Sequence, residues 1–197
     1  MSYIVLHENE TFTQALESRT KTATEPIECY KVIEERMSGS GRVEYWTYPM
    51  YSALNEDVVS GKALQHPHGE PMPVQNENNT IRLDKGFVHA YKSYEEALRF
   101  MEKSGVFGYS ETRPVVYRCV IPDGATYIEA LNPHHDGEER PTIYAASALQ
   151  FCEPITQKVY GKTMPYVKME KPDYKKKKFG IIYDESQING DVENNDE

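Results

Sequence analysis

Histidines are the first residues in this chain whose type and spacing could do chemistry. His66 and His68 stand two positions apart around a proline, so both imidazoles face one side of an extended segment. Such a pair could begin a metal site, although a metal needs at least one further donor. No C-x-x-C or H-E-x-x-H spacing supplies that donor. The pair is therefore a metal candidate, and we favour the alternative of two histidines in a solvated loop.

His89 is a second candidate because it precedes a segment with helical periodicity. The N–H groups at a helix N-terminus can hold an anion, which would place His89 beside such a site. If Cys29 or Cys119 approached it, a Cys–His pair could act as a nucleophile. The alternative that we favour is a histidine packed at the edge of a sheet.

The longer catalytic signatures are absent from the chain. It contains no G-x-S-x-G, no phosphate-binding P-loop and no G-x-G-x-x-G. Glu129, Glu138 and Glu139 could act as paired carboxylates only if the fold brought them together. The sequence therefore favours a protein without enzymatic activity and predicts no cofactor.

Composition narrows the class of protein further. The 197 residues carry a formal net charge of −9, which argues against general nucleic-acid binding because phosphate contacts need clustered Lys and Arg. Fifteen tyrosines suit half-buried sheet surfaces or interfaces. No apolar run approaches a membrane span, and no export signal is readable. Cys29, Cys119 and Cys152 are widely spaced in apolar runs, which predicts reduced, buried thiols and a cytoplasmic protein.

The clearest structural unit of the sequence is the stretch Lys85–Lys103. Residues 87–91 predict a short strand, and Ser93 with Glu96 has the spacing of a helix capping box. The apolar side chains that follow recur on one helical face, namely Tyr94, Ala97, Leu98 and Met101. We therefore expect a strand followed by an amphipathic helix over about residues 93–104.

Further strands are predicted on both sides of this unit. Alternation or apolar runs indicate them over residues 3–6, 27–33, 42–48, 114–121 and 125–131. A brief helical face begins at Phe12. The flexible turn 38–41 joins two of these strands into a hairpin, and residues 114–131 read as another. Residues 143–155 are ambiguous between a helix and a final core strand. The predicted class is α+β, with a mostly antiparallel twisted sheet and one main helix.

The domain organisation follows from where periodicity is lost. Residues 1–155 are expected to form one domain, interrupted by a long irregular loop at 55–84. Residues 156–197 read as a partly extended tail with an acidic end. The tail holds a basic block followed by a short apolar segment. Together they are a candidate partner-binding segment: Lys175, Lys176, Lys177, Lys178, Phe179, Ile181, Ile182 and Tyr183.

The order of these segments resembles a small uncharacterised domain of phage and bacterial proteins. The resemblance rests on KGFVHAYKSYEEALRF, then VVYRCVIPDGATYIEA, and a closing YAAS…LQF, and it covers about residues 27–155. It implies a fold and a phage or mobile-element setting, without an activity.

A fainter similarity is to ADP-ribosyltransferase domains. It would place Tyr30, Lys31, His89, Tyr91 and Glu153 around a pocket. The chain departs from that family because residues 88–91 lack the serine–threonine motif and no E-x-E or Q-x-E follows. If the fold is related, the resemblance implies lost chemistry.

Three functions are therefore expected in decreasing order. The first is a non-enzymatic phage-type protein that acts through protein contacts or self-association, in the virion or the host cytoplasm, with its tail as the attachment segment. The second is an ADP-ribosyltransferase-like enzyme or nucleotide-binding domain. The third is a metal-binding protein through His66 and His68.

Overall fold

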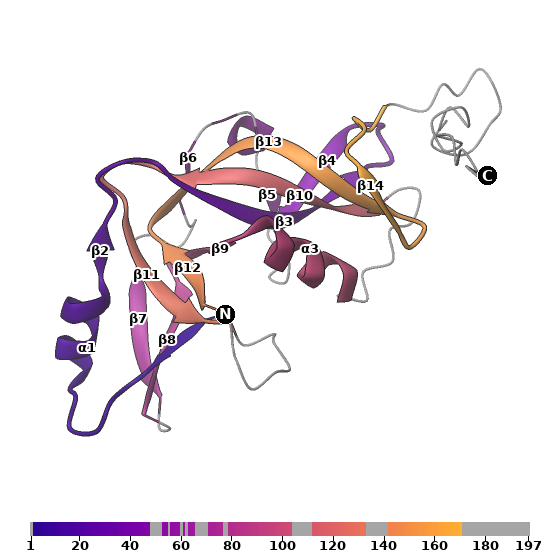
Figure 1. The fold of residues 1–197 in the computed structure, drawn as a ribbon. Helices are drawn as coiled ribbons and strands as arrows, with labels where there is room; N and C mark the ends of the chain where they lie inside the picture. Colours follow the sequence, from indigo (N-terminus) through magenta and orange to yellow (C-terminus); the bar gives the residue numbers. More distant parts are fainter. Residues whose placement is uncertain are drawn as a thin grey trace, which may run out of the picture.

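Antiparallel strands dominate the fold of this protein. The structure, a computed structural model, describes residues 2–47, 53–54, 56–59, 61, 63–65, 71–76, 79–103, 112–132 and 142–170. Its fourteen strands form one connected sheet in the order β14-β13-β10-β3-β9-β12-β11-β1-β8-β7, with β2, β4, β5 and β6 pairing off this path (Figure 1). The protein is therefore a sheet-rich, mostly antiparallel fold, as the sequence predicts.

The elements follow one another along the chain in this order: β1 (Tyr3–Val5), α1 (Phe12–Arg19), β2 (Lys21–Thr22), β3 (Ile27–Met37), β4 (Val43–Thr47), β5 (Ala53–Leu54), α2 (Glu56–Val59), β6 (Ala63–Gln65), β7 (Met72–Asn76), β8 (Thr80–Lys85), β9 (Val88–Tyr91), α3 (Tyr94–Lys103), β10 (Thr112–Ile121), β11 (Thr126–Leu131), β12 (Thr142–Ala146), β13 (Ala148–Val159) and β14 (Lys162–Pro165).

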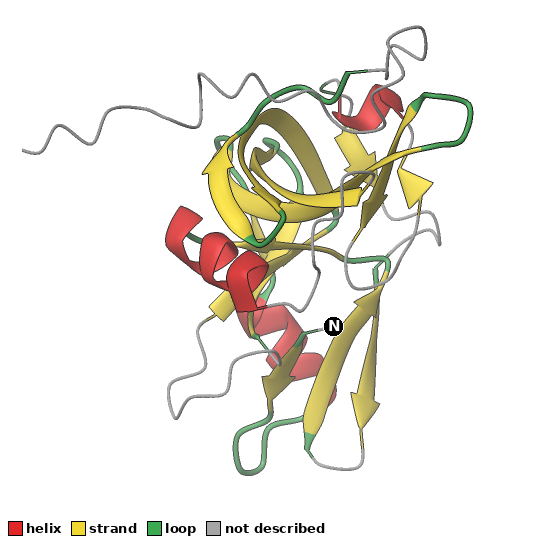
Figure 2. Ribbon diagram, turned by 90° about the vertical axis from the view of Figure 1, so that its right-hand side faces the viewer, coloured by secondary structure: helices red, strands yellow, loops and turns green. Residues whose placement is uncertain are grey.

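The sheet divides into two parts at β3. Strands β4, β10, β13 and β14 extend it on one side and curl around a common interior (Figure 2). Strands β9, β12, β11, β1, β8 and β7 form the second, flatter part. β3 pairs with β9 through the single pair Tyr30–Tyr91, whereas its residues from Ile33 onward pair with β4. The two parts therefore meet along one short junction.

Three buried clusters correspond to this division. The interior of the curled part and the neighbouring face of β9 and β12 share one cluster, which includes Cys29, Val115 and Phe151. A second cluster packs α1 against β1, β8 and β11. A third packs α3 against β3 and β10 through Ala97, Met101 and Val116. Helices α1 and α3 thus each cover part of the sheet.

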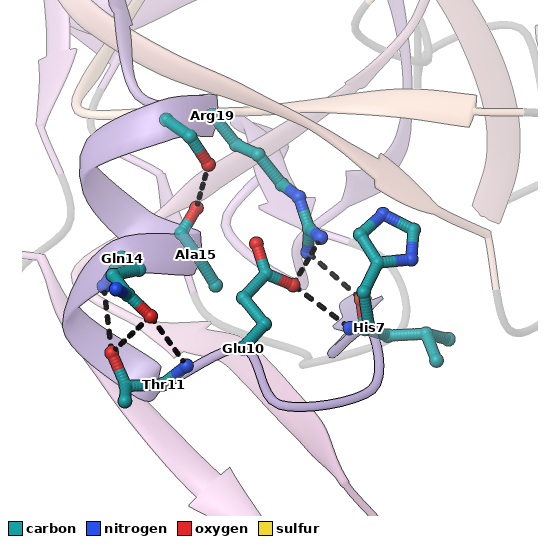
Figure 3. Close-up of polar contacts among 8 residues, drawn as sticks. His7, Glu10, Thr11, Gln14, Ala15 and Arg19 are labelled. Carbon is teal, nitrogen blue, oxygen red and sulfur yellow. Dashed lines mark hydrogen bonds and ion pairs between the residues drawn. The ribbon is translucent and has the colours of Figure 1, made fainter.

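Local capping explains where α1 begins. The Oγ1 atom of Thr11 accepts a hydrogen bond from the Gln14 backbone N–H, and the Gln14 side chain accepts one from the Thr11 N–H, a complete capping box (Figure 3). Glu10 accepts a backbone hydrogen bond from His7 and pairs with Arg19 at 2.7 Å. Arg19 also donates to the Val5 carbonyl, so the helix is tied to β1.

The predicted strand–helix unit forms as β9 and α3. The Ser93 Oγ atom accepts a hydrogen bond from the Glu96 N–H at 3.2 Å, which is the first half of the expected capping box. The Oε2 atom of Glu96 is buried without a partner, so this oxygen does not make the returning bond. The prediction of one main helix is only roughly right, because α1, with 8 residues, is nearly as long as α3, with 10.

The prediction of a hairpin over residues 114–131 is wrong, although both of the expected strands form. β10 pairs with β3 and β13, whereas β11 pairs with β12, β1 and β2. Gly124, in the left-handed region at φ +78°, donates its N–H to Ala23, whose own N–H donates to Ala125. The turn is therefore held by the segment before β3 and leads the chain from one part of the sheet to the other.

Two further expectations differ from the structure. The stretch 55–84, expected as an irregular loop, contains α2, β6, β7 and β8 in its described parts. Residues 142–146, which could have been helical, are the strand β12. Short strands such as β7 have little periodicity of their own and form because a neighbouring strand supplies their hydrogen bonds.

The C-terminal side of the domain also extends further than expected. The boundary expected at Ile155 falls inside β13, and β14 adds a strand beyond it. Met169 is buried, and Tyr166 packs against the interior of the curled part. Cys152, expected to be buried, is exposed, because β13 bulges between Phe151 and Glu153 and leaves Cys152 without a register partner on β10.

Candidate functional site

Lys31 lies at the junction where the two parts of the sheet meet. Its Nζ atom donates a hydrogen bond to the His89 carbonyl at 2.7 Å, next to the single backbone pair Tyr30–Tyr91. The side chain is buried, and burial lowers the pKa of the ammonium to about 8. The thiols of Cys29 and Cys119 interact with it electrostatically. Lys31 is thus a buried amine whose hydrogen bond connects β3 to β9.

The imidazole of His89 lies on the opposite face from those thiols. Its Nε2 atom is 2.6 Å from the Leu83 carbonyl and 2.9 Å from the Ser2 hydroxyl. The neighbouring side chains of Val88 and Ala90 pack in the cluster that contains Cys29 and Cys119. Since side chains alternate along a strand, the His89 ring points away from that cluster. The considered Cys–His pair therefore does not form, and His89 connects β9 to β8 and to the N-terminal segment.

Tyr30, Tyr91 and Glu153 share one row across the outer face of the sheet. Glu153 of β13 is opposite Arg118 of β10, Arg118 is opposite Tyr30, and Tyr30 is opposite Tyr91. Arg118 Nε donates to Glu153 Oε1 at 2.9 Å. Of the five residues that the second resemblance would place around a pocket, these three thus lie together, while Lys31 points to the other face.

Glu28 completes the polar contacts of this row. The Tyr30 hydroxyl donates to Glu28 Oε1 at 2.5 Å, and Arg118 Nη1 lies 3.5 Å from Glu28 Oε2. The hydrogen bond from Tyr30 lowers the pKa of Glu28, and the same bond raises the pKa of Tyr30 to about 12. The phenol therefore stays protonated and the carboxylate charged near neutral pH, so neither group is poised to transfer a proton.

A second polar group, none of whose members was a candidate from the sequence, lies inside the curled part. Glu35 Oε2 accepts from Arg113 Nη2 at 2.7 Å and Nε at 3.1 Å, and Glu35 Oε1 accepts from the Tyr117 hydroxyl at 2.8 Å. Tyr166 stacks its ring under the Arg113 guanidinium, 5.1 Å away. Burial, followed by the charge of Glu35, raises the pKa of both tyrosines. Both carboxylate oxygens have donors, which indicates a structural role.

The sequence carried a faint signal for this inner group. Cys29, Lys31, Ile33 and Glu35 occupy alternate positions of β3 and all face the interior. Two of the four are charged, which is unusual for the buried face of a strand. The pairing of Glu35 with Arg113 across β3 and β10 offsets the cost of burying these two charges.

A third polar group lies on β11 and β12 of the flatter part. Glu129 pairs with both Lys21 and Lys92, and these lysines lie over the rings of Tyr127 and Tyr144 at 5.9 and 5.4 Å. The hydrogen bond from Lys21, followed by that from Lys92, lowers the pKa of Glu129. The carboxylate is therefore held charged between two cations.

Exposed apolar side chains gather at the end of the flatter part. Among the described residues, five large hydrophobic side chains are exposed, and three of them belong to β1 and β7: Val5 at 47%, Met72 at 58% and Val74 at 37%. Val5 and Val74 face the same side, because Tyr3, Arg82 and Val74 form one cross-strand row. Ile4 and Ile81, on the opposite face, are buried under α1. We call Val5, Met72 and Val74 the β7 patch.

β7 is also the last strand in the order of the sheet. No strand pairs with its outer edge within the described part of the chain. Pro73, in the middle of β7, has no N–H to offer to a further strand. Contact by the face of the strand is therefore favoured over addition of a strand to its edge.

The remaining candidate residues lie outside the described residues. These are His66 and His68, and the tail segment from Lys175 to Tyr183. Among the residues that are described, no group of three or more His, Cys, Asp or Glu side chains could hold a metal ion. No helix in the described ranges is long and apolar enough to cross a membrane.

The comparisons with known proteins leave the chain without an assigned family. No protein-family model matches it, and no curated protein or solved structure shows significant similarity. The function therefore has to be argued from the geometry described above.

Proposed function

We propose that this protein is non-enzymatic and works through protein–protein contacts made by the β7 patch. The observation that carries the proposal is the concentration of exposed apolar side chains, since three of the five among the described residues lie on β1 and β7. Scattered single apolar residues are ordinary on a surface, whereas a group at one end of a sheet is typical of a contact site. The partner is another protein or a second copy of this chain.

The energetics are consistent with such a role. Full burial of a Val or Met side chain contributes about 1.5–3 kcal/mol. Because the patch residues are 37% to 58% exposed, covering all three contributes on the order of 3 kcal/mol. This is a part of the free energy that an interface needs, and surrounding contacts would have to supply the rest.

The state of the candidate catalytic groups supports a non-enzymatic role. Lys31 donates to a backbone carbonyl, Tyr30 to Glu28, and Arg118 to Glu153. A general acid or base has to reach a substrate proton, and each of these groups is already engaged within the protein. A virion-associated or accessory role in a phage, with the tail as an attachment segment, remains part of the proposal and rests on the resemblance alone.

The test compares charge substitutions inside and outside the patch. The double variant Met72→Lys, Val74→Lys should abolish self-association in analytical ultracentrifugation. If the unmodified chain is monomeric, the double variant should instead lose one specific band in affinity capture. Val167→Lys is the matched control, because Val167 is an exposed valine at 43% that follows β14, at the other end of the strand order. Equal behaviour of the two variants would rule out the patch.

One observation favours an ADP-ribosyltransferase-like or nucleotide-binding function as a second candidate. Tyr30, Tyr91 and Glu153 share a row beside the junction where Lys31 connects the two parts. If the protein has this second function, NAD should raise its melting temperature, and Glu153→Gln should reduce that rise. An unchanged melting temperature at saturating NAD would exclude it. Elemental analysis of the purified full chain tests the third candidate, the metal site at His66 and His68.

A further inference from the structure

Two of the three cysteines lie directly opposite each other at the centre of the sheet. Cys29 of β3 and Cys119 of β10 are register partners, and neither side chain is exposed. Both pack in the same interior cluster, beside Phe151. Both are free thiols. The fold thus brings together two cysteines that the sequence places far apart.

The spacing of paired strands suits a covalent bond between them. Directly opposed residues of an antiparallel pair have Cα atoms about 4.5 or 5.5 Å apart, depending on the hydrogen-bonding pattern. A disulfide accommodates Cα separations of about 4.4–6.8 Å. Both Cα separations fall within that range, so the pairing of β3 and β10 brings the two cysteines close enough to be cross-linked.

Cys152 differs from this pair in position and access. It is exposed, and it occupies the bulge of β13 without a register partner on β10. Phe151, which precedes it, is the residue opposite Cys119. Cys152 is therefore the accessible thiol of the chain and serves as an internal reference for oxidation.

We propose that Cys29 and Cys119 form a dithiol that closes to a cross-strand disulfide in the folded protein when it meets a peroxide. Hydrogen peroxide oxidises one thiol to a sulfenic acid and leaves as one water. The sulfur of the second thiol then attacks that sulfenic sulfur and displaces its oxygen as a second water, which carries both remaining thiol and hydroxyl hydrogens. Overall, two thiols lose two electrons and two protons to one peroxide.

Access sets the rate of this reaction. Burial raises the pKa of the Cys29 thiol to about 12 and that of Cys119 well above its usual range. Thiolates are the reactive form, so both thiols react more slowly than an exposed cysteine. A small neutral oxidant reaches a sheet interior more readily than glutathione. The pair therefore responds to sustained oxidation, after Cys152.

The product would fix the register of β3 and β10 beside the junction. Cys29 is two residues from Lys31 and on the same face, so the bond lies next to the contact that connects β3 to β9. A cross-link between residues far apart in sequence restricts the unfolded chain and stabilises the fold. The oxidised protein should therefore melt at a higher temperature than the reduced protein.

The experiment uses the full folded chain treated with hydrogen peroxide over a time course. Free thiols are blocked with N-ethylmaleimide, and the protein is digested without reduction for mass spectrometry. The expected product joins the Cys29 peptide to the Cys119 peptide with the loss of two hydrogens, and the melting temperature rises and returns on reduction. The Cys152→Ser variant should give the same product.

Several results would overturn the proposal. One is a chain in which Cys152 is oxidised while Cys29 and Cys119 both remain blockable as free thiols. Another is a Cys29–Cys119 link that forms only in urea, because the proposal requires the folded sheet. Cys29→Ala and Cys119→Ala, each verified as folded by circular dichroism, must both lose the peroxide-dependent rise in melting temperature. If either variant does not fold, the peptide map of the unmodified chain decides.

Discussion

The Nζ atom of Lys31 and the carbonyl oxygen of His89 lie 2.7 Å apart and connect the two parts of the sheet where their backbone pairing is reduced to one residue pair. A buried backbone carbonyl needs a donor, and here a side chain from the other part of the sheet supplies one. The contact is available because Lys31 faces the interior of the curled part, close enough to β9 to reach its backbone. Lys31 therefore has a structural task that explains a buried lysine without invoking catalysis.

Replacing Lys31 should change how stability depends on pH. The pKa of Lys31 is about 8 in the folded protein and 10.5 in the reference state. Between these values the unfolded chain binds the proton and the folded chain does not, so stability rises with pH, by up to about 3 kcal/mol. Lys31→Met should remove that rise. Urea unfolding from pH 7 to pH 10.5 measures it.

The control for this prediction is Lys158→Met. Lys158 also donates to backbone carbonyls, of Met101 and Glu102, but at the surface. The Lys158→Met variant should retain the pH dependence of stability seen for the unmodified protein. Parallel pH profiles for Lys31→Met and the unmodified chain would contradict the assignment, whatever their difference in absolute stability.

Breaking the inner ion pair from one side should be costly. Glu35→Leu leaves the Arg113 charge buried and unpaired, and Arg113→Met leaves that of Glu35, so each should lower the free energy of unfolding by about 3–5 kcal/mol. The double variant should recover much of this loss, because neither charge of the pair remains buried. Denaturant unfolding of all four proteins gives the coupling energy. Additive losses would show that the two residues are energetically independent.

The outer row provides a comparison for that cycle. Arg118 and Glu153 form an ion pair with both side chains partly or well exposed. Arg118→Met should lower stability by no more than about 1 kcal/mol, because solvent screens the pair. If Arg118→Met lowered the free energy of unfolding as much as Arg113→Met, burial would not explain the difference expected between the two ion pairs.

The capping box of α1 should contribute measurably to stability. Thr11→Ala removes the side-chain acceptor for the Gln14 N–H (Figure 3) and should cost about 1 kcal/mol. Thr13→Ala, an exposed position inside the same helix, should be neutral or slightly stabilising, since alanine has the higher helix propensity. Thermal unfolding separates the two, and an equal loss would argue against the cap.

Glu129 should titrate below an ordinary glutamate. Hydrogen bonds from Lys21 and Lys92 lower its pKa, so the stabilisation is present above the unfolded pKa and is lost as the pH falls through the folded one. Lys21→Gln and Lys92→Gln should each raise the pKa of Glu129. Carboxyl chemical shifts followed by NMR between pH 2 and pH 6 test this. A Glu129 pKa unaffected by either change would contradict it.

Several elements were predictable because their signals are local. Ser93 caps α3 through a bond to a residue three positions away, and the apolar spacing of Tyr94, Ala97 and Met101 defines the buried face. The alternation in β3 and the apolar run of β10 likewise predicted strands. In each case the determining residues lie within a few positions of one another, and their pattern is readable without knowing what they pack against.

The candidate site was less predictable because it depends on which strands become neighbours. The turn 122–124 had the residue types of a tight turn, but its bonds to Ala23 sent β11 to a different part of the sheet. That choice decided that Glu35 would meet Arg113, and Cys29 would meet Cys119. The exposed position of Cys152 likewise follows from a bulge relative to β10, which no local pattern specified.

The sequence by itself determined the existence of the main strands, the caps of two helices, and the charge and composition of the surface. The tertiary structure decided the pairing of strands and, through it, which charged residues are buried and which apolar residues of β1 and β7 stay exposed. The physical reason is that helix capping and side-chain alternation depend on residues close in the chain. Strand pairing instead depends on hydrogen bonds and packing between distant segments. Alternative pairings differ in free energy only once the whole sheet is assembled.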